Sequence, residues 1–280
     1  MPWPNFSIEV PGKWILTGEH SVIRGFPAIA LPHDDLSLKF DFNPGGRALE
    51  IFPKNISKSI LELLEIARSP KPEGTLTIES TIPMGSGFGS SAALCVALTK
   101  WLATPLSISE DKHFEFAKVL ENHFHGESSG MDIAVVMKRE ALLYVKGQGG
   151  QPLGLKKLPR FTFHDTGKRA KTLDCVRRVK ALITENPALL KYDTLMGEAT
   201  ERAQEGLRAF DQGNKENGLK LLAEGMKKAQ ECFYAWNLVP KEALALEKNL
   251  YQQGALAVKI TGAGGGGFLV ALWGEKIYGW

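Results

Sequence analysis

The sequence predicts a mixed α+β protein, and two observations lead to that prediction. Short segments that alternate apolar and polar residues, as half-buried strands do, dominate the first half of the chain. From residue 173 to residue 253 the pattern becomes a succession of helices, with breaks near Asn186-Pro187, Gly213-Asn214 and Val239-Pro240. A chain of 280 residues is long enough for one large domain or two modest ones. The change in pattern places a domain boundary near residues 155–170.

The elements expected in the first half are mostly strands. The segment "FSIEVPGKWILTGEH" predicts two strands around a Pro-Gly turn, and "PAIALP" and "LSLKFDF" predict two more. A helix is expected over residues 56–68, and a strand over 75–82. Further helices are expected from about Ser90 to Ala103 and from about Ile108 to Phe124, the second with a capping box of Ser107 and Glu110. Near the C-terminus "ALAVKI" and "FLVALW" predict two strands that flank a glycine cluster.

Composition excludes several classes of protein. With 44% apolar and 23% charged residues the chain has the composition of an ordinary globular protein. A net charge of +3 without a dense basic block does not indicate nucleic-acid binding. The three cysteines are too far apart for a metal site, and their odd number is unlike a disulfide framework. No signal peptide and no membrane span is visible in the sequence, so we expect a cytoplasmic protein.

The segment "PMGSGFGSSAAL" (83–94) predicts an anion site. A glycine-rich turn leads directly into a helix there, and the first backbone N–H groups of a helix are free to bind an anion. No lysine follows Gly89, so the segment is not a Walker A loop, and Ser90 stands where a dinucleotide fingerprint needs glycine. The alternative is an ordinary glycine turn in which Ser90 or Ser91 caps the helix.

Three further features could contribute to the same site. Lys13 follows a Pro-Gly pair, and Glu19-His20 follows a second glycine, although single residues of these types are usually structural. Glu121 falls at the edge of an apolar helical stripe, where a carboxylate is costly unless a cation pairs with it or it reaches solvent. Asp132, after Ser-Gly-Met, could equally be a turn residue. In "KITGAGGGGFLVAL" (259–272) the glycines favour close approach of the backbone to a ligand.

Taken together and in this order, these segments resemble the GHMP kinases. The likeness rests on three motifs, "PGKWILTGEHSVIRGFPAIA", "HGESSGMD" and "KITGAGGGGF". The loop "PMGSGFGSSAAL" lies between the first motif and the second. Within the family the motifs are most similar to the mevalonate kinase branch. The resemblance implies a two-domain α+β fold. It implies a left-handed β-α-β unit in an N-terminal ATP-binding domain, residues 1–160, and a ferredoxin-like C-terminal domain, residues 161–280.

The resemblance also implies a role for each matching residue. Asp132 matches the catalytic base and Lys13 the lysine that keeps this aspartate ionised. Ser91 and Glu121 match the ligands of Mg²⁺. Glu19, His20, Thr261 and Gly262 are expected on the substrate side. The ATP-binding residues implied by the resemblance are Asn55, Gly85, Ser86, Gly87, Phe88, Gly89, Ser90 and Ser91.

The implied reaction is phosphoryl transfer from ATP to mevalonate, on the route to isoprenoids, with Mg²⁺ as cofactor. Some residues depart from the family pattern: Phe88 replaces a leucine, Glu127-Ser128 replaces a small residue and proline, and Ile133 follows the aspartate. Two alternatives therefore stay open, a kinase for phosphomevalonate, a sugar or another small alcohol, and a non-catalytic ligand sensor. The expected partner is a small-molecule alcohol, with no nucleic acid and no membrane; a homodimer stays open.

Overall fold

A computed structural model describes residues 3–126 and 128–274 of the chain. These residues fall into two compact units, and neither is continuous in sequence. Unit 1 consists of Met1–Lys13, Pro32–Met84 and Phe88–Arg139, and unit 2 of Trp14–Leu31, Gly85–Gly87 and Glu140–Trp280. Strands β1 (Phe6–Thr17) and β2 (Ala28–Pro44) each contribute residues to both units.

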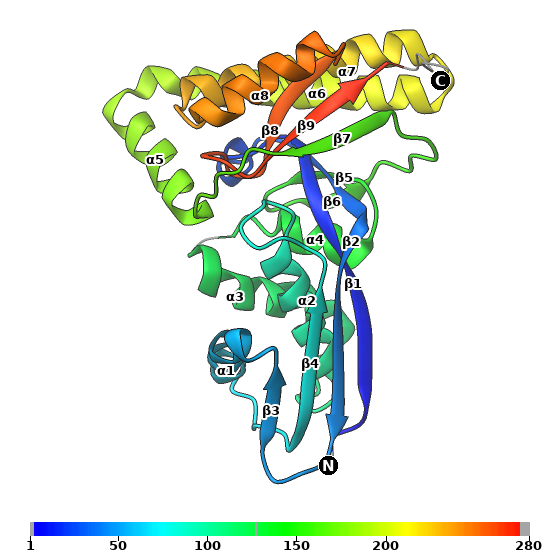
Figure 1. The fold of residues 1–280 in the computed structure, drawn as a ribbon, viewed down its shortest axis with the longest axis vertical. Coiled ribbons are helices and arrows are strands. Elements are labelled where there is room, and N and C mark those ends of the chain that lie inside the picture. The colour runs from blue at the N-terminus through cyan, green and yellow to red at the C-terminus, as the bar shows by residue number, and fades with distance from the viewer. Residues whose placement is uncertain (1–2, 127, 275–280) are drawn as a thin grey trace. The chain divides into compact units, whose positions relative to one another are not determined.

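Unit 1 contains a β-α-β element beside an antiparallel strand pair. Strands β3 (Leu49–Phe52) and β4 (Gly74–Ser80) are parallel and are joined through helix α1 (Ser57–Ile66). Strand β4 then pairs antiparallel with β2, with Phe40 opposite Ile78 (Figure 1). The helices of unit 1 that follow are α2 (Ser90–Ala103), α3 (His113–His125) and α4 (Met131–Lys138), and α2 packs against both of the others.

An aromatic cluster fills part of the core of unit 1. The ring of Trp101, on α2, lies 5.3 Å from the ring of Phe40 and 4.9 Å from that of Phe42. Phe40 and Phe42 both point inward from β2 because side chains two positions apart share one face of a strand. Burial of three large rings anchors α2 to the sheet, and α2 carries the glycine loop at its N-terminus.

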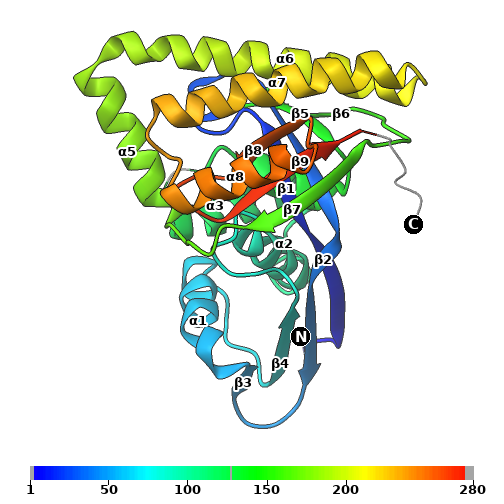
Figure 2. The same cartoon turned by 45° about the horizontal axis from the view of Figure 1, so that its top comes forward.

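Unit 2 is built on a small antiparallel sheet in the order β7-β9-β8, formed by Arg160–Asp165, Phe268–Trp273 and Ala257–Thr261. Two long helices, α6 (Lys191–Asp211) and α7 (Lys215–Ala235), lie side by side (Figure 2). Helices α7 and α8 (Lys241–Gln252) contact strand β8. The remaining elements of unit 2 are α5 (Thr172–Glu185), β5 (Leu142–Val145) and β6 (Gly149–Pro152).

The core of unit 2 lies between these helices and the sheet. Phe233 of α7 and Trp236, which directly follows that helix, are completely buried, as are Ile260 of β8 and Leu269 of β9. Trp14 packs its ring against Phe161 and Phe163 on β7. No helix within the described part of the chain is both long and apolar enough to span a bilayer.

The Pro-Gly turn predicted at residues 11 and 12 is wrong, because β1 runs through it as one strand. Gly12 does not adopt a positive φ. Instead, a Cβ at this position would lie 3.1 Å from the carbonyl oxygen of Phe88, so glycine favours the close approach of two backbones here. The two strands predicted over residues 27–42 are likewise a single strand, β2.

The capping box predicted at Ser107 is also wrong. Ser107 adopts a positive φ of 53° and the chain continues into a short 3-10 helix, Glu110–Lys112, before α3 begins at His113. The helices expected over 56–68 and 90–103 and the helical region with its three breaks are confirmed by α1, α2 and α5 to α8.

Candidate active site

Lys13 and Asp132 form an ion pair in unit 1. The Lys13 Nζ lies 2.7 Å from Oδ2 of Asp132. The lysine side chain is 3% exposed, whereas that of Asp132 is 26% exposed. A buried ammonium therefore holds a carboxylate that solvent and a ligand can still reach.

The glycine loop fixes the position of Lys13. The backbone N–H of Lys13 donates to the carbonyl oxygen of Phe88 over 2.9 Å. Gly89, the N-cap of α2, has a φ of 78°, and a Cβ there would lie 2.8 Å from Cγ of Lys13. Glycine is thus required at position 89 both for its backbone conformation and for the space that the lysine occupies.

Asp132 is positioned by the start of α4. It is the second residue of that helix, whose N-cap is Gly130 in the left-handed conformation. The preceding loop is ordered by its own serines, since the N–H of Met131 donates to Oγ of Ser129 and that of Gly130 to Oγ of Ser128. A carboxylate in the first turn also interacts favourably with the helix dipole.

Glu121, on α3, is a buried carboxyl group with one unsatisfied oxygen. Its side chain is almost completely buried, and within the described residues Oε1 has no hydrogen-bond partner. Oε2 accepts a hydrogen bond from Oγ of Ser128. Burial, and then the negative charge of Asp132, raise the pKa of Glu121 to about 8, although Ser128 and Lys13 oppose that shift. An unpartnered buried carboxylate oxygen is the arrangement that a bound cation would satisfy.

The first turn of α2 carries Ser90 and Ser91, both half-buried. The N-cap position of this helix is held by Gly89, so neither serine is the N-cap residue. The interpretation of these serines as ordinary caps is therefore wrong. Ser91 is the residue predicted to share Mg²⁺ with Glu121, and helices α2 and α3 pack together. No cluster of three or more His, Cys, Asp or Glu side chains suited to a metal occurs among the described residues.

The other residues predicted to bind ATP are divided between the two units. The side chain of Phe88 is buried and packs against the ring of His33 at 5.0 Å, so only its backbone could face a nucleotide. Asn55 lies exposed in the short 3-10 helix Lys54–Ile56. Gly85, Ser86 and Gly87 belong to unit 2.

In unit 2 the two glycine-rich segments of the sequence meet each other. A Cβ at Gly87 would lie 3.1 Å from the carbonyl oxygen of Thr261, and one at Gly267 would lie 3.0 Å from that of Ser86. Gly264 and Gly265 are crowded by Phe233 and by Ala170 in the same way. The glycines of residues 262–267 are thus required by packing within the protein, an explanation that the sequence alone did not provide.

Glu19 and His20 are both buried in unit 2. Oε1 of Glu19 accepts from Nζ of Lys259 over 2.6 Å, and both side chains are almost inaccessible. Nε2 of His20 lies 2.8 Å from the carbonyl oxygen of Ala263, which can only accept, so Nε2 carries the proton. Burial lowers the pKa of His20 to about 4, and the imidazole is neutral at pH 7.

Thr261 is the last residue of β8, and Gly262 is the residue that follows it. The hydroxyl group of Thr261 donates to the carbonyl oxygen of Ile15 and accepts from the N–H of the same residue, at 2.9 and 3.1 Å. The hydroxyl proton of Thr261 is thus used in a hydrogen bond that joins β8 to β1. Gly262 is buried with a φ of 88°. The substrate-side role predicted for Thr261 would have to be carried by its backbone.

Sequence reasoning missed several polar residues that these sites depend on. Lys259 was not singled out, although a lysine inside the apolar run "ALAVKI" is a signal of a paired buried charge. Ser128 was treated as a departure from a family pattern, and it donates to Glu121. Arg24 and the buried Asp193 form a two-bond ion pair that no local pattern indicated. Glu127 lies outside the described residues.

Comparisons with known proteins agree on one family. The family model for the N-terminal domain of GHMP kinases matches residues 55–139. A mevalonate kinase from Thermococcus sibiricus is 32% identical and aligns over 96% of this chain and 89% of its own length.

Solved structures share the fold. The L. major mevalonate kinase in complex with R-mevalonate has a TM-score of 0.75 at 22% identity, over 97% of this chain and 88% of that one. The phosphomevalonate kinase of Streptococcus pneumoniae in complex with phosphomevalonate and AMPPNP has a TM-score of 0.74 at 17% identity, over 96% of this chain and 92% of that one.

Proposed function

The chain belongs to the GHMP kinase family, and from that premise we propose that it transfers the γ-phosphoryl group of ATP to a hydroxyl group of mevalonate, giving 5-phosphomevalonate. The observation that carries the proposal is the Lys13–Asp132 ion pair, held by the glycine loop that precedes α2. Phosphoryl transfer depends on positioned groups of these types, a base for the alcohol and positive charge for the phosphoryl oxygens.

Asp132 acts as the base in this proposal. An alcohol must lose its proton as its oxygen attacks the γ-phosphoryl group, and the exposed part of the Asp132 carboxylate can accept it. Lys13 pairs with Asp132 and offsets charge on the transferred group. The backbone N–H groups at the start of α2, with Ser90 and Ser91, are the proposed donors to the phosphates of ATP.

Glu121 and Ser91 are the proposed holders of Mg²⁺. The unpartnered Oε1 of Glu121 supports this assignment, because a buried carboxylate gains a partner when a cation binds. When bound, Mg²⁺ neutralises the charge of the ATP phosphates. Ser128 then has a positioning role, since its hydroxyl group fixes the second oxygen of Glu121.

Mevalonate is favoured as the acceptor because the relative with 32% identity over most of both chains is a mevalonate kinase. Phosphomevalonate is the second candidate, because an enzyme for it shares the fold. A non-catalytic sensor would be expected to have lost Lys13, Glu121 or Asp132, and all three are present.

Finer features of the family complete the proposal. They are a left-handed crossover between β3 and β4, a ferredoxin-like C-terminal domain, the domain division at residues 160 and 161, and a place in the cytoplasm. The parallel pairing of β3 and β4 supports the first of these features, and the three-stranded antiparallel sheet of unit 2 supports the second. The homodimer stays a prediction.

The test is a coupled assay of ADP release with mevalonate, phosphomevalonate, galactose and homoserine as acceptors. Mevalonate should give the highest kcat/KM. An acceptor that exceeds it by about tenfold, or ~1.4 kcal/mol of transition-state binding, would replace mevalonate in the assignment. Absence of ADP release with every acceptor, from a folded protein that still binds ATP, would favour the sensor.

A further inference from the structure

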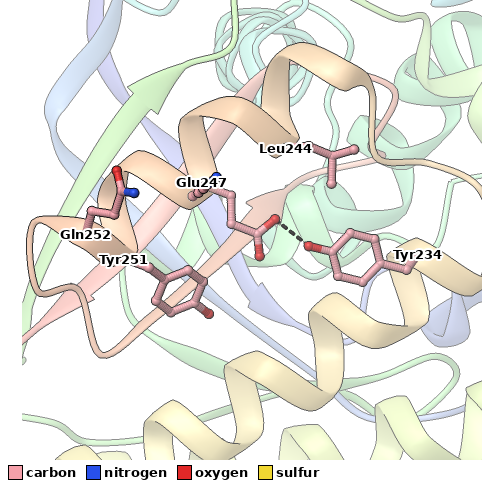
Figure 3. A pocket seen from close by; sticks show the side chains of 6 residues that line it. Tyr234, Leu244, Glu247, Tyr251 and Gln252 are labelled. Atoms are coloured by element: carbon pink, nitrogen blue, oxygen red, sulfur yellow. Dashed lines mark hydrogen bonds between the residues drawn. The ribbon is translucent and has the colours of Figure 1, made fainter.

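Helices α7 and α8 enclose a hollow on unit 2 that the proposed reaction does not use. It has a volume of about 500 Å³ and is open to solvent. None of its lining residues belongs to the candidate active site. They are Tyr234 of α7 and Leu244, Glu247, Lys248, Tyr251 and Gln252 of α8 (Figure 3).

The hollow contains a buried carboxylate whose charge has no cationic partner. Glu247 is 7% exposed. Its Oε2 accepts from the hydroxyl group of Tyr234 over 2.5 Å and from Nε2 of Gln230 over 3.1 Å. Both donors are neutral, and no lysine, arginine or histidine within the described residues forms an ion pair with Glu247. Lys248 also lines the hollow, but it forms no ion pair with Glu247.

Two tyrosine rings lie on either side of this carboxylate. Figure 3 shows the rings of Tyr234 and Tyr251 on either side of Glu247, with Leu244 above Tyr234 in this view. The hydroxyl oxygen of Tyr251 accepts from the N–H of Val258 over 3.2 Å, so its own proton remains available to a ligand. Tyr234 and Leu244 are each 44% exposed and Tyr251 is 36% exposed, which leaves apolar surface at the opening.

We propose that this hollow binds an organic cation, a guanidinium or alkylammonium group carried on an aliphatic chain. The charge would pair with Glu247, and the electron-rich faces of the two tyrosine rings would attract the same charge. Leu244 would cover the aliphatic chain. A bare metal ion fits less well, because one carboxylate is far short of the oxygen ligands that such ions require.

A purely structural role for Glu247 is the competing explanation. Gln230 donates to Glu247 and accepts, through Oε1, from the N–H of Ile260 on β8. These bonds tie α8 to α7 and to the sheet without any ligand. The two explanations differ in one measurable respect, since only the proposed binding site predicts selective binding of a cation.

The experiment titrates the full chain with n-butylguanidinium and with n-butylurea, a neutral molecule of nearly the same shape, in a calorimeter at pH 8. We expect saturable binding of butylguanidinium with a Kd of about 1 mM, as befits a fragment of this size, and none of butylurea. Glu247→Gln should weaken binding by about tenfold or more, the scale of a charge-assisted contact. Glu231→Gln, an exposed glutamate of α7 outside the hollow, should bind as the wild type does.

A second variant covers the case in which Glu247→Gln does not fold. Leu244 is exposed, so Leu244→Lys should fold, and it places a positive charge at the opening that should weaken butylguanidinium binding severalfold. Equal binding of the cation and the urea, or binding unaffected by Glu247→Gln and Leu244→Lys, would overturn the proposal and leave the structural role.

Two further ligands distinguish the source of the cation. Agmatine represents a free small amine, and an Ala-Arg-Ala peptide with blocked termini represents an arginine on the surface of a partner protein. Tighter binding of agmatine would assign the hollow to a metabolite, and tighter binding of the peptide to a protein. Failure of both to compete with butylguanidinium would contradict the proposal.

Discussion

Two lysine–carboxylate pairs in which the lysine is buried, Lys13–Asp132 and Lys259–Glu19, differ mainly in exposure. In unit 1 the Lys13 Nζ lies 2.7 Å from Asp132, and in unit 2 the Lys259 Nζ lies 2.6 Å from Glu19. Asp132 is 26% exposed, whereas Glu19 is 2% exposed and Lys259 is 0% exposed. Distance alone would give the two pairs the same role.

Exposure separates the pairs into two kinds. A substrate hydroxyl can reach Asp132, so that pair can take part in chemistry. The Lys259 ammonium is enclosed, donates also to the carbonyl oxygen of Ile260, and lies over the ring of Phe233. Burial lowers the pKa of Lys259, and Glu19 opposes that shift. Removing a charged group from the Lys13–Asp132 pair should therefore lower activity. Removing one from the Lys259–Glu19 pair should lower stability.

The largest effect should follow from Asp132→Asn. The amide keeps the size of the side chain and removes its basicity, so kcat should fall by about 10²–10⁴, the usual contribution of a positioned base. Binding of ATP and mevalonate, measured by calorimetry, should persist. Lys13→Met should also lower kcat strongly, and the double variant should lose less than the two single losses combined, because the groups act as a unit.

Stability is the control for that variant. The thermal midpoint of Asp132→Asn should stay close to that of the wild type because this carboxylate is partly solvated. A folded Asp132→Asn enzyme whose kcat is within about threefold of the wild type would exclude Asp132 as the base.

Lys259→Met should have the opposite signature. It removes the buried ammonium group that pairs with the Glu19 carboxylate, which should cost about 3–5 kcal/mol of unfolding free energy. Urea unfolding measures the loss. Adding Glu19→Gln removes the buried charge and should restore about half of that stability or more. If Lys259→Met unfolds at the same urea concentration as the wild type, the pair is not a structural element of unit 2.

His20 extends the comparison to a buried group that is neutral. Its pKa is about 4 in the folded chain and about 6.5 in the unfolded one, so the unfolded chain binds more protons between those values. The contribution of neutral, buried His20 to the free energy of unfolding is present above about pH 6.5. As the pH falls toward 4 this contribution is lost, and the free energy of unfolding decreases by up to ~3 kcal/mol.

The measurement is urea unfolding between pH 7 and pH 4, compared with His20→Asn. Asparagine tolerates the positive φ of 62° found at this position. The variant should lose less stability over that pH range than the wild type. Equal pH dependence of the two proteins would show that His20 is not held neutral by burial.

The smallest effect in this series concerns Glu121, a third carboxyl group whose exposure is even lower than that of Glu19. Glu121→Gln should raise the Mg²⁺ concentration for half-maximal rate by about tenfold, because one charged ligand is lost. Glu115→Gln, an exposed position on the same helix, is the matched control. Unchanged Mg²⁺ dependence in a folded Glu121→Gln enzyme would give Glu121 a purely structural role.

Local patterns predicted the helices well and the strands less well. Helix α2 extends from Ser90 to Ala103 as expected, because its apolar pattern and the glycine before it are local signals. Pro11-Gly12 and Pro32 were read as strand ends, yet β1 and β2 continue through them. Proline is compatible with a strand where no ladder hydrogen bond is needed from its nitrogen, and that depends on neighbours that the sequence does not reveal.

The candidate site was predictable to the extent that family motifs carry it. The family motifs predicted that Lys13 would act on Asp132, and the two side chains form an ion pair in unit 1. The contacts of Thr261 with Ile15, and of Gly87 with Gly262, join residues more than a hundred positions apart. Such contacts follow from the tertiary structure, and no periodicity or turn signal encodes them.

The Glu19–Lys259 ion pair has a consequence for the order of events during synthesis. The two residues are 240 positions apart in one unit, which begins with Trp14–Leu31 and resumes mainly at Glu140. At about 5–20 residues per second, the ribosome needs roughly 10–50 s to pass from one partner to the other. During that interval the segment around Glu19 has been translated without the strand that neutralises its charge. Unit 2 can therefore complete its fold only after Lys259 has been translated.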